Sequence, residues 1–175
     1  MSFDSGLPKR RSIRLAGAEY GNGCYFVTIC TDGRRLLFGE IKDNLCVLSP
    51  TGKIAEACWI QIPSHLPYVQ LDAFVFMPNH VHAILFIDHT MNPEADRQFG
   101  LPVRGTLATV VGSYKSAVTK SVNQTFERRE QPLWQRGYHE TIIRTQDAYD
   151  RVREYIVLNP ERWAEDQDNP DRENR

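Results

Sequence analysis

The sequence predicts an α+β fold in which an antiparallel sheet lies on one side and helices lie on the other. Three observations support this prediction. Segments rich in β-branched and aromatic residues recur along the 175 residues, and segments with apolar residues three and four positions apart lie between them. Only Pro78-Asn79 separates two of the extended segments, which is the length of a tight hairpin turn. The resulting order is β-α-β-β-α-β, with one more helix at the end.

The first half of the chain contains a strand, two short extended pieces and a helix. Their predicted ranges are residues 24–30, 36–41, 45–48 and 49–62. Residues 31–35 form a turn after the strand, and Asp43-Asn44 turns the chain between the two short pieces. Ser49-Pro50 starts the helix, and Pro63 is expected to stop it.

The second half supplies two strands joined as a hairpin, a helix, another strand and the last helix. Their predicted ranges are residues 69–77, 80–87, 106–122, 133–143 and 145–160. Thr145 is the predicted N-cap of the last helix, and Asp147 lies in its first turn, where an acidic residue is favourable. Residues 88–100 show no periodicity, and we expect them to be mobile. The whole pattern is that of a ferredoxin-like, or RRM-like, antiparallel sheet with helices packed on it.

Length and composition indicate one globular domain. Residues 1–19 read as a basic arm, residues 20–164 as the domain, and residues 165–175 as an acidic tail with five acids and two bases. No run of about 18 apolar residues and no secretory leader is visible, so we expect a cytoplasmic protein without membrane association. The four cysteines lack Cys-x-x-Cys spacing and are predicted to be buried thiols rather than zinc ligands or disulfides.

Two histidines stand at the start of the second hairpin strand, in Pro78-Asn79-His80-Val81-His82. Because side chains alternate along a strand, His80 and His82 point to one face and Val81 to the other. The pair offers two imidazole lone pairs, which is too few for a structural zinc site but leaves room for oxygen ligands on a catalytic divalent ion. The alternative is that one histidine caps the strand and the other is a satisfied sheet residue.

Tyr155 and Asn159 lie one turn apart on the apolar stripe of the last helix. Separately, a tyrosine there is ordinary packing and an asparagine before proline is an ordinary helix terminator. Together with the histidines they suit the breaking of a DNA strand. A phenol is a poor nucleophile at neutral pH, and a divalent ion held by His80, His82 and the Asn159 oxygen would polarise the scissile phosphate. Attack by Tyr155 would leave a 5′-phosphotyrosine and a free 3′-hydroxyl.

An ordered set of motifs resembles the HUH single-tyrosine transposases of small bacterial insertion sequences, most closely the REP-associated tyrosine transposases. The matching segments are residues 11–15, 25–31, 37–41, 77–82, 114–116, 133–136 and 155–160. The resemblance implies a ferredoxin-like core, metal binding by His80 and His82, Tyr155 as nucleophile and Asn159 as third ligand. It also implies Mg²⁺ or Mn²⁺ as the ion and single-stranded DNA with a hairpin as substrate. Residues 138–141 depart from the expected Phe-His-Asp-His pattern, so no role follows for Thr141.

Hairpin recognition would combine phosphate contacts with base stacking on aromatic rings. The candidate DNA-binding residues are Arg10, Arg11, Arg14, Lys115, Trp134, Arg136 and Arg144, and Tyr138 is an alternative to Trp134 for stacking. Each could instead be an ordinary surface charge or core aromatic. The protein could act as a monomer or a homodimer. Two other functions stay open: a domesticated module that binds hairpin DNA or RNA without turnover, and a metal-dependent hydrolase acting through water.

Overall fold

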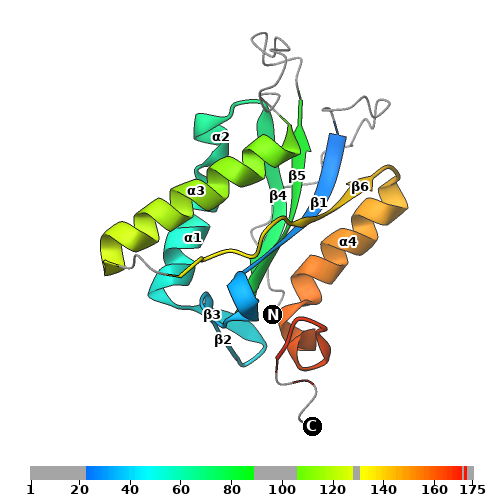
Figure 1. The fold of residues 1–175 in the computed structure, drawn as a ribbon. Helices are drawn as coiled ribbons and strands as arrows, with labels where there is room; N and C mark the ends of the chain where they lie inside the picture. The colour runs from blue at the N-terminus through cyan, green and yellow to red at the C-terminus, as the bar shows by residue number, and fades with distance from the viewer. Residues whose placement is uncertain (1–22, 89–105, 128–130, 171, 173–175) are drawn as a thin grey trace, which may run out of the picture.

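The computed structural model describes residues 23–88, 106–127, 131–170 and 172. Its main sheet has four antiparallel strands in the order β4-β5-β1-β6, with β5 and β1 in the centre (Figure 1). The strands are β1 (Gly23–Cys30), β4 (Val69–Phe76), β5 (His80–Ile87) and β6 (His139–Ile143). This order is the ferredoxin-like arrangement that the sequence predicted. The hairpin across Pro78-Asn79 is β4 followed by β5.

Helices cover both faces of this sheet. Helices α1 (Pro50–Ile60) and α3 (Leu107–Phe126) pack on one face, where they enclose the larger core around Trp59. Helix α4 (Gln146–Leu158) packs on the other face over a smaller apolar cluster that includes Ile156. Figure 1 shows α4 across the sheet from α1 and α3. The prediction that all helices lie on one side of the sheet was therefore wrong, because β1 and β5 carry apolar residues on both faces.

The alternation along β5 decides what each helix meets. Val81, Ala83 and Leu85 belong to the larger core beneath α1 and α3. The intervening side chains face α4, where Ile84 joins the smaller cluster and His82 lies beside Tyr155 of that helix. The sheet thus delivers the predicted histidine face to the last helix.

The observed elements differ from the predicted ones near Pro63 and around the turn at Asp43-Asn44, where both residues have positive φ. Strands β2 (Gly39–Lys42) and β3 (Leu45–Leu48) form a separate two-stranded sheet, whose turn places Asp43 and Asn44 at φ 50° and 60°. Pro63 does not stop a single long helix. It lies in the first turn of α2 (Ile62–His65), where proline is tolerated because no helical N–H is needed there.

Threonine and serine caps fix where the long helices begin. Ser49, Thr106 and Thr145 are the N-caps of α1, α3 and α4, and each side chain accepts a hydrogen bond from a backbone N–H three residues later. The predicted Thr145 cap is confirmed. After α4 the chain continues through η3 (Pro160–Glu165) and folds back toward the sheet.

Several predictions fall wholly or partly outside the described residues. These are the basic arm at 1–19 and all but Asp88 of the segment 88–100. Among the described helices, none combines the length and apolar character required to cross a lipid bilayer. The four cysteines are free thiols, with Cys24 and Cys30 buried and Cys46 and Cys58 partly buried.

Candidate functional site

The two histidines lie side by side on β5, on the face that α4 covers. Their ring centroids are 4.4 Å apart, and the exposed fractions are 0% for His80 and 4% for His82. On the neighbouring central strand, Cys30 pairs with His80 and Thr28 pairs with His82. The pair therefore lies on β5, a central strand that is hydrogen-bonded to a neighbour on each side.

Asn79 determines which nitrogen of His80 carries its proton. The Asn79 amide donates to the backbone oxygens of Arg34, at 3.1 Å, and Asp168, at 2.6 Å, so its oxygen Oδ1 faces His80 Nδ1 at 2.8 Å. Because an amide oxygen only accepts, Nδ1 must donate and Nε2 keeps its lone pair. His80 Nε2 is buried and has no hydrogen-bond partner among the described residues. That unpaired acceptor is suited to a cation.

His82 connects the sheet to Tyr155. Its Nδ1 lies 2.8 Å from Thr28 Oγ1, and its Nε2 lies 3.2 Å from the Tyr155 hydroxyl. The Tyr155 ring packs edge-on against Phe26, with ring centroids 6.0 Å apart. Tyr155 is still 36% exposed, so its hydroxyl borders solvent as well as the histidine pair.

Burial keeps both imidazoles neutral. It lowers the pKa of His80 well below its usual value, with smaller contributions from His82 and the Arg34 guanidinium. Burial, followed by Arg34, lowers the pKa of His82 to about 3. Neutral imidazole is the form that binds metal ions.

Tyr155 is protonated at neutral pH. Burial raises its pKa, the Asp166 carboxylate raises it further, and hydrogen bonding by the Asn159 side chain acts in the opposite direction. A phenol in this environment requires help to become a nucleophile. The group that its hydroxyl contacts is His82 Nε2.

Asn159 also presents an unpaired acceptor. Its side chain is buried, and Oδ1 has no hydrogen-bond partner among the described residues. A buried oxygen without a hydrogen-bond partner lowers the stability of the fold unless a ligand or an ion contacts it. Imidazole nitrogen and amide oxygen are both ligand types that divalent cations accept, so Asn159 stays a candidate ligand beside the histidines.

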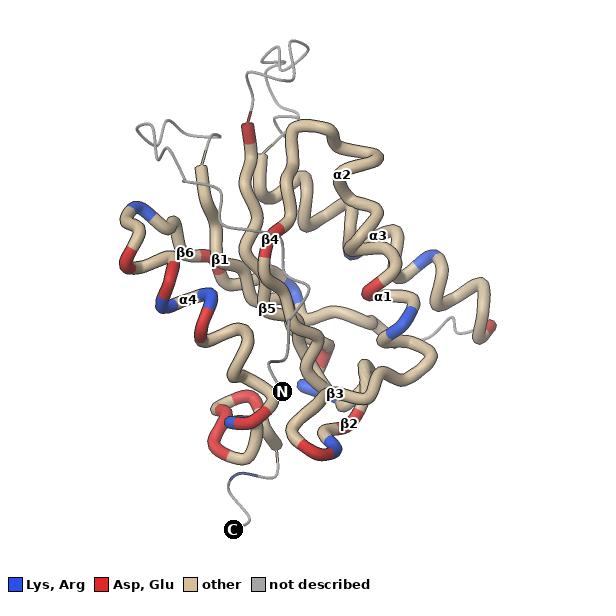
Figure 2. The backbone as a smooth tube through the Cα atoms, turned by 180° about the vertical axis from the view of Figure 1, so that it is seen from behind, with Lys and Arg blue, Asp and Glu red and all other residues tan. Residues whose placement is uncertain are grey.

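Sequence reasoning missed two acids of the C-terminal segment. Ligand atoms of His80, His82 and Asp166 all lie within 4.8 Å of one another, so Asp166 is a further candidate metal ligand. Asp168 is buried, forms an ion pair with Arg34, and places Oδ2 3.8 Å from His80 Nδ1. Figure 2 shows acidic residues gathered along η3 and the segment after it. Both acids follow Pro160, where helical periodicity ends. In the sequence near these acids, only the aromatic residue Trp163 indicated that the segment packs against the domain.

Lys115 and Trp134, two of the predicted DNA-binding residues, make contacts within the fold. Lys115 Nζ donates to the backbone oxygens of Gln135, at 2.9 Å, and Gly137. The Trp134 ring packs against the Phe38 ring at 5.3 Å, and its N–H donates to the Lys115 carbonyl at 3.1 Å. These contacts support a structural role for both residues, and their DNA-binding role stays a prediction.

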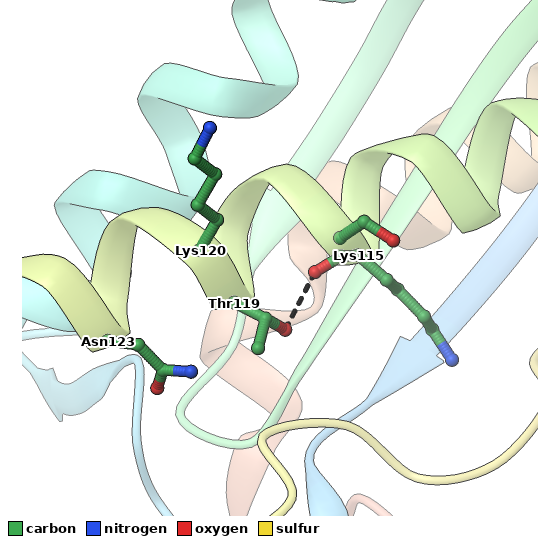
Figure 3. A pocket seen from close by; sticks show the side chains of 5 residues that line it. Lys115, Thr119, Lys120 and Asn123 are labelled. Carbon is green, nitrogen blue, oxygen red and sulfur yellow. Dashed lines mark hydrogen bonds between the residues drawn. The ribbon is translucent and has the colours of Figure 1, made fainter. Parts of the chain in front are cut away.

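The other predicted DNA-binding residues lie elsewhere. Arg136 and Arg144 are exposed, whereas Arg10, Arg11 and Arg14 lie outside the described residues. A shallow depression of about 390 Å³ lies along the outer side of α3 (Figure 3). All of its lining residues come from that one helix, and the Thr119 hydroxyl donates to the Lys115 carbonyl within it. The depression is thus separate from the histidine site.

Comparison with known proteins finds a relative in sequence and several solved structures with a similar fold. A Haemophilus influenzae protein that bears the name "uncharacterized protein" is 36% identical over 174 residues, covering 94% of this chain and 96% of its own length. A REP-associated tyrosine transposase bound to a REP hairpin has a TM-score of 0.52 at 20% identity, over 84% of this chain and 72% of its own. A candidate transposase from Deinococcus radiodurans R1 has a TM-score of 0.49 at 16% identity, over 85% and 96%. No family model matches the chain.

Proposed function

We propose that this chain nicks and rejoins single-stranded DNA. The chain belongs to one family with the Haemophilus influenzae protein, and it has the fold of a REP-associated tyrosine transposase. The reaction would pass through a 5′-phosphotyrosine on Tyr155 at hairpin-containing sites. This is a transposase-type activity, and it would take place in the cytoplasm, where bacterial DNA is located. The chain could carry out this reaction as a monomer or as a homodimer.

The observation that carries this proposal is the contact between Tyr155 and the histidine pair. The Tyr155 hydroxyl lies 3.2 Å from His82 Nε2, and His82 in turn contacts His80. A partly exposed tyrosine hydroxyl beside two neutral, buried imidazoles is an arrangement typical of functional sites. A nucleophile that acts next to a metal-bound phosphate has to lie beside the metal ligands, which supports Tyr155 in this role. A bound ion would take over the His82 Nε2 lone pair that the hydroxyl contacts in the metal-free chain.

His80, His82 and Asn159 would hold the divalent ion, with Asp166 as an additional oxygen ligand. When bound, Mg²⁺ or Mn²⁺ would supply positive charge that stabilises the phosphate in the transition state. Thr28 and Asn79 orient the two imidazoles through their Nδ1 atoms. The chain therefore contains both ligands and the groups that orient them.

In the proposed step the Tyr155 oxygen attacks phosphorus and forms a phosphotyrosine bond as the bond to the 3′ oxygen breaks. The phenol proton passes from Tyr155 to water, and the departing 3′ oxygen takes up a proton from water to become a 3′-hydroxyl. Attack by that or another 3′-hydroxyl on the phosphotyrosine reverses the step and rejoins DNA. The covalent bond to Tyr155 conserves the energy of the phosphodiester.

Hairpin DNA is the proposed substrate because the structural neighbour is described as bound to a REP hairpin. The exposed Arg136 and Arg144 are available to bind its phosphates. A module that binds hairpin DNA or RNA without turnover remains the alternative outcome of the test. A hydrolase acting through water is the second alternative.

The test incubates the full chain with labelled single-stranded hairpin DNA and Mn²⁺, followed by a denaturing gel and mass spectrometry of the protein. We expect a covalent adduct on Tyr155 that EDTA prevents and Tyr155→Phe abolishes without loss of DNA binding. Tyr68→Phe is the matched control, because Tyr68 is buried in the larger core on the opposite face of the sheet. Retention of hairpins without an adduct would favour the binding module, and cleavage that survives Tyr155→Phe would favour the hydrolase.

A further inference from the structure

Arg34 occupies a strained backbone position directly beside the histidine pair. It follows Gly33 in the turn after β1 and has φ 55°, a conformation that side chains larger than glycine seldom adopt. Its backbone oxygen accepts a hydrogen bond from Asn79 Nδ2, the same amide that orients His80. Its N–H donates to Thr31 O at 3.2 Å. These two backbone hydrogen bonds hold Arg34 in its strained conformation next to the histidine pair.

The Arg34 guanidinium reaches the site through one carboxylate. Its Nη1 forms an ion pair with Asp168 Oδ1, while Asp168 Oδ2 lies 3.8 Å from His80 Nδ1. Nη1 is buried, yet it makes no hydrogen bond of normal geometry among the described residues. The side chain as a whole is 34% exposed, so part of it is open to solvent. The positive charge of Arg34 also lowers the pKa of both histidines.

The charges around the histidines leave a place for one anion. Both imidazoles are neutral, Arg34 contributes one positive charge, and Asp166 and Asp168 each contribute a negative charge. A divalent ion at the histidines would change the local sum from minus one to plus one. A phosphodiester carries a single negative charge and matches guanidinium geometry, as a carboxylate does.

We propose that Arg34 is a phosphate-binding residue of this site, and that an incoming phosphate takes the place of the Asp168 carboxylate on its guanidinium. This rests on the proposed function insofar as the phosphate is that of DNA. The anion site itself does not depend on cleavage. Asp168 then serves as the counter-ion of Arg34 while no phosphate is bound.

A purely structural ion pair makes the opposite prediction. If Arg34 and Asp168 only attach the C-terminal segment to the turn after β1, neutralising Asp168 loosens that segment and creates no affinity for anions. If Arg34 is a phosphate ligand, neutralising Asp168 removes its competitor. The two models therefore differ in the sign of the effect of Asp168→Asn on phosphate affinity.

The experiment measures binding of inorganic phosphate to the full chain without divalent metal, by calorimetry and by ³¹P line broadening. We expect Asp168→Asn to bind phosphate about tenfold more tightly than the unmodified chain, which corresponds to one charged hydrogen bond gained. The gain should vanish in the double variant Arg34→Gln with Asp168→Asn. Asp32→Asn is the matched control, because Asp32 pairs with the neighbouring Arg35 at 3.7 Å and should leave phosphate affinity unchanged.

No gain in Asp168→Asn, or a gain that persists in the double variant, overturns the proposal. Thermal unfolding establishes that each variant is folded. Should Asp168→Asn be unfolded, affinity for hairpin DNA without metal decides, with Arg34→Gln expected to reduce the salt slope by about one and Arg35→Gln to leave it unchanged. An equal slope in Arg34→Gln and the unmodified chain rejects the phosphate role. Absence of a Tyr155 adduct would instead reject the cleavage function and leave this anion site standing.

Discussion

The Tyr149 hydroxyl donates a hydrogen bond to the Asp72 carboxylate and thereby fastens α4 to β4. The other carboxylate oxygen lies 3.7 Å from Arg153 Nε, one helical turn further along. Burial, together with the bonded carboxylate, raises the pKa of Tyr149, so its hydroxyl remains a donor. These two contacts come just before Tyr155 and set how α4 lies across the sheet.

Asp72→Ala should therefore slow DNA cleavage more than it weakens metal binding. We expect the single-turnover cleavage rate to fall about tenfold or more, since misplacement of a nucleophile by a fraction of a bond length is costly. Mn²⁺ affinity, measured by calorimetry, should fall less than the rate, because the two histidines lie on β5 and only Asn159 and Asp166 among the proposed ligands follow α4. Asp150→Ala is the control, because Asp150 is an exposed acid of the same helix. Equal losses in rate and in Mn²⁺ affinity would show that Asp72 supports the whole site instead of α4.

Asn79→Ala should weaken metal binding although Asn79 is not proposed as a ligand. The substitution removes the acceptor that holds His80 Nδ1–H, so the imidazole loses its fixed tautomer and orientation. Loss of such an orienting group typically costs about 10- to 100-fold in metal affinity. Calorimetric titration with Mn²⁺ measures the effect, and Gln135→Ala provides an exposed amide as control. An unchanged affinity would contradict the assigned tautomer.

The metal-free protein should lose stability as the pH falls below 6.5. The unfolded chain takes up a proton on each histidine near that pH, whereas the folded chain does not, because burial lowers the pKa of His80 well below 6.5 and that of His82 to about 3. The stability is complete above pH 6.5 and decreases by about 1.4 kcal/mol per pH unit for each histidine below it.

Urea unfolding in EDTA at pH 7, 6 and 5 measures this slope. His82→Gln should flatten it, whereas His65→Gln should not, because His65 is exposed at the end of α2. Parallel slopes for all three proteins would mean that the histidines titrate alike in the folded and unfolded chains.

Lys115→Met should destabilise the fold, in contrast to substitution of the exposed arginines. The change removes two hydrogen bonds to the backbone oxygens of Gln135 and Gly137, so we expect a loss of about 1–2 kcal/mol in the free energy of unfolding. Arg136→Gln and Arg144→Gln should leave that free energy unchanged and lower the salt-dependent affinity for hairpin DNA. Chemical unfolding and a salt titration of binding separate the two effects. An unchanged unfolding free energy in Lys115→Met would return this residue to the DNA-binding set.

Two glycine substitutions, one in α1 and one in α3, test how closely each helix packs at that position. A Cβ on Gly52 would collide with the backbone oxygen of Phe38, so Gly52→Ala should destabilise the protein by about 1–3 kcal/mol. A Cβ on Gly112 of α3 meets nothing within 4 Å, so Gly112→Ala should stabilise it by about 0.5–1 kcal/mol. Thermal unfolding of the two variants should give shifts of opposite sign. Shifts of the same sign would mean that Phe38 yields to the added methyl group.

Periodicity carried most of the fold and the first part of the site. Alternation along β5 predicted that His80 and His82 share a face, and helical spacing predicted that Tyr155 and Asn159 lie on the buried stripe of α4. These are local consequences of strand and helix geometry. The contact between Tyr155 and His82 also requires that the buried stripe of α4 packs on the histidine face of β5. The order of the sequence motifs indicated this packing.

Periodicity could not reveal which face each helix covers or where irregular segments fold back. α4 crosses to the other side of the sheet because both faces of β1 and β5 are apolar, which leaves the choice of face to packing. Asp166 and Asp168 follow Pro160, where no repeat predicts direction, and their acidic surroundings are typical of a solvated tail. Arg34 depends on a positive φ in a turn, which a sequence without glycine at that position does not suggest.

The pairing of β1 with β5 has a consequence for how the site comes into being. His80 and His82 face α4 only in the register that sets Cys30 opposite His80 and Thr28 opposite His82. A slip of one residue on β5 would turn both imidazoles toward α1 and α3 and bring Val81 into their place. The metal affinity proposed for this chain would therefore depend on strand alignment. A population that binds the ion stoichiometrically has also completed its central sheet correctly.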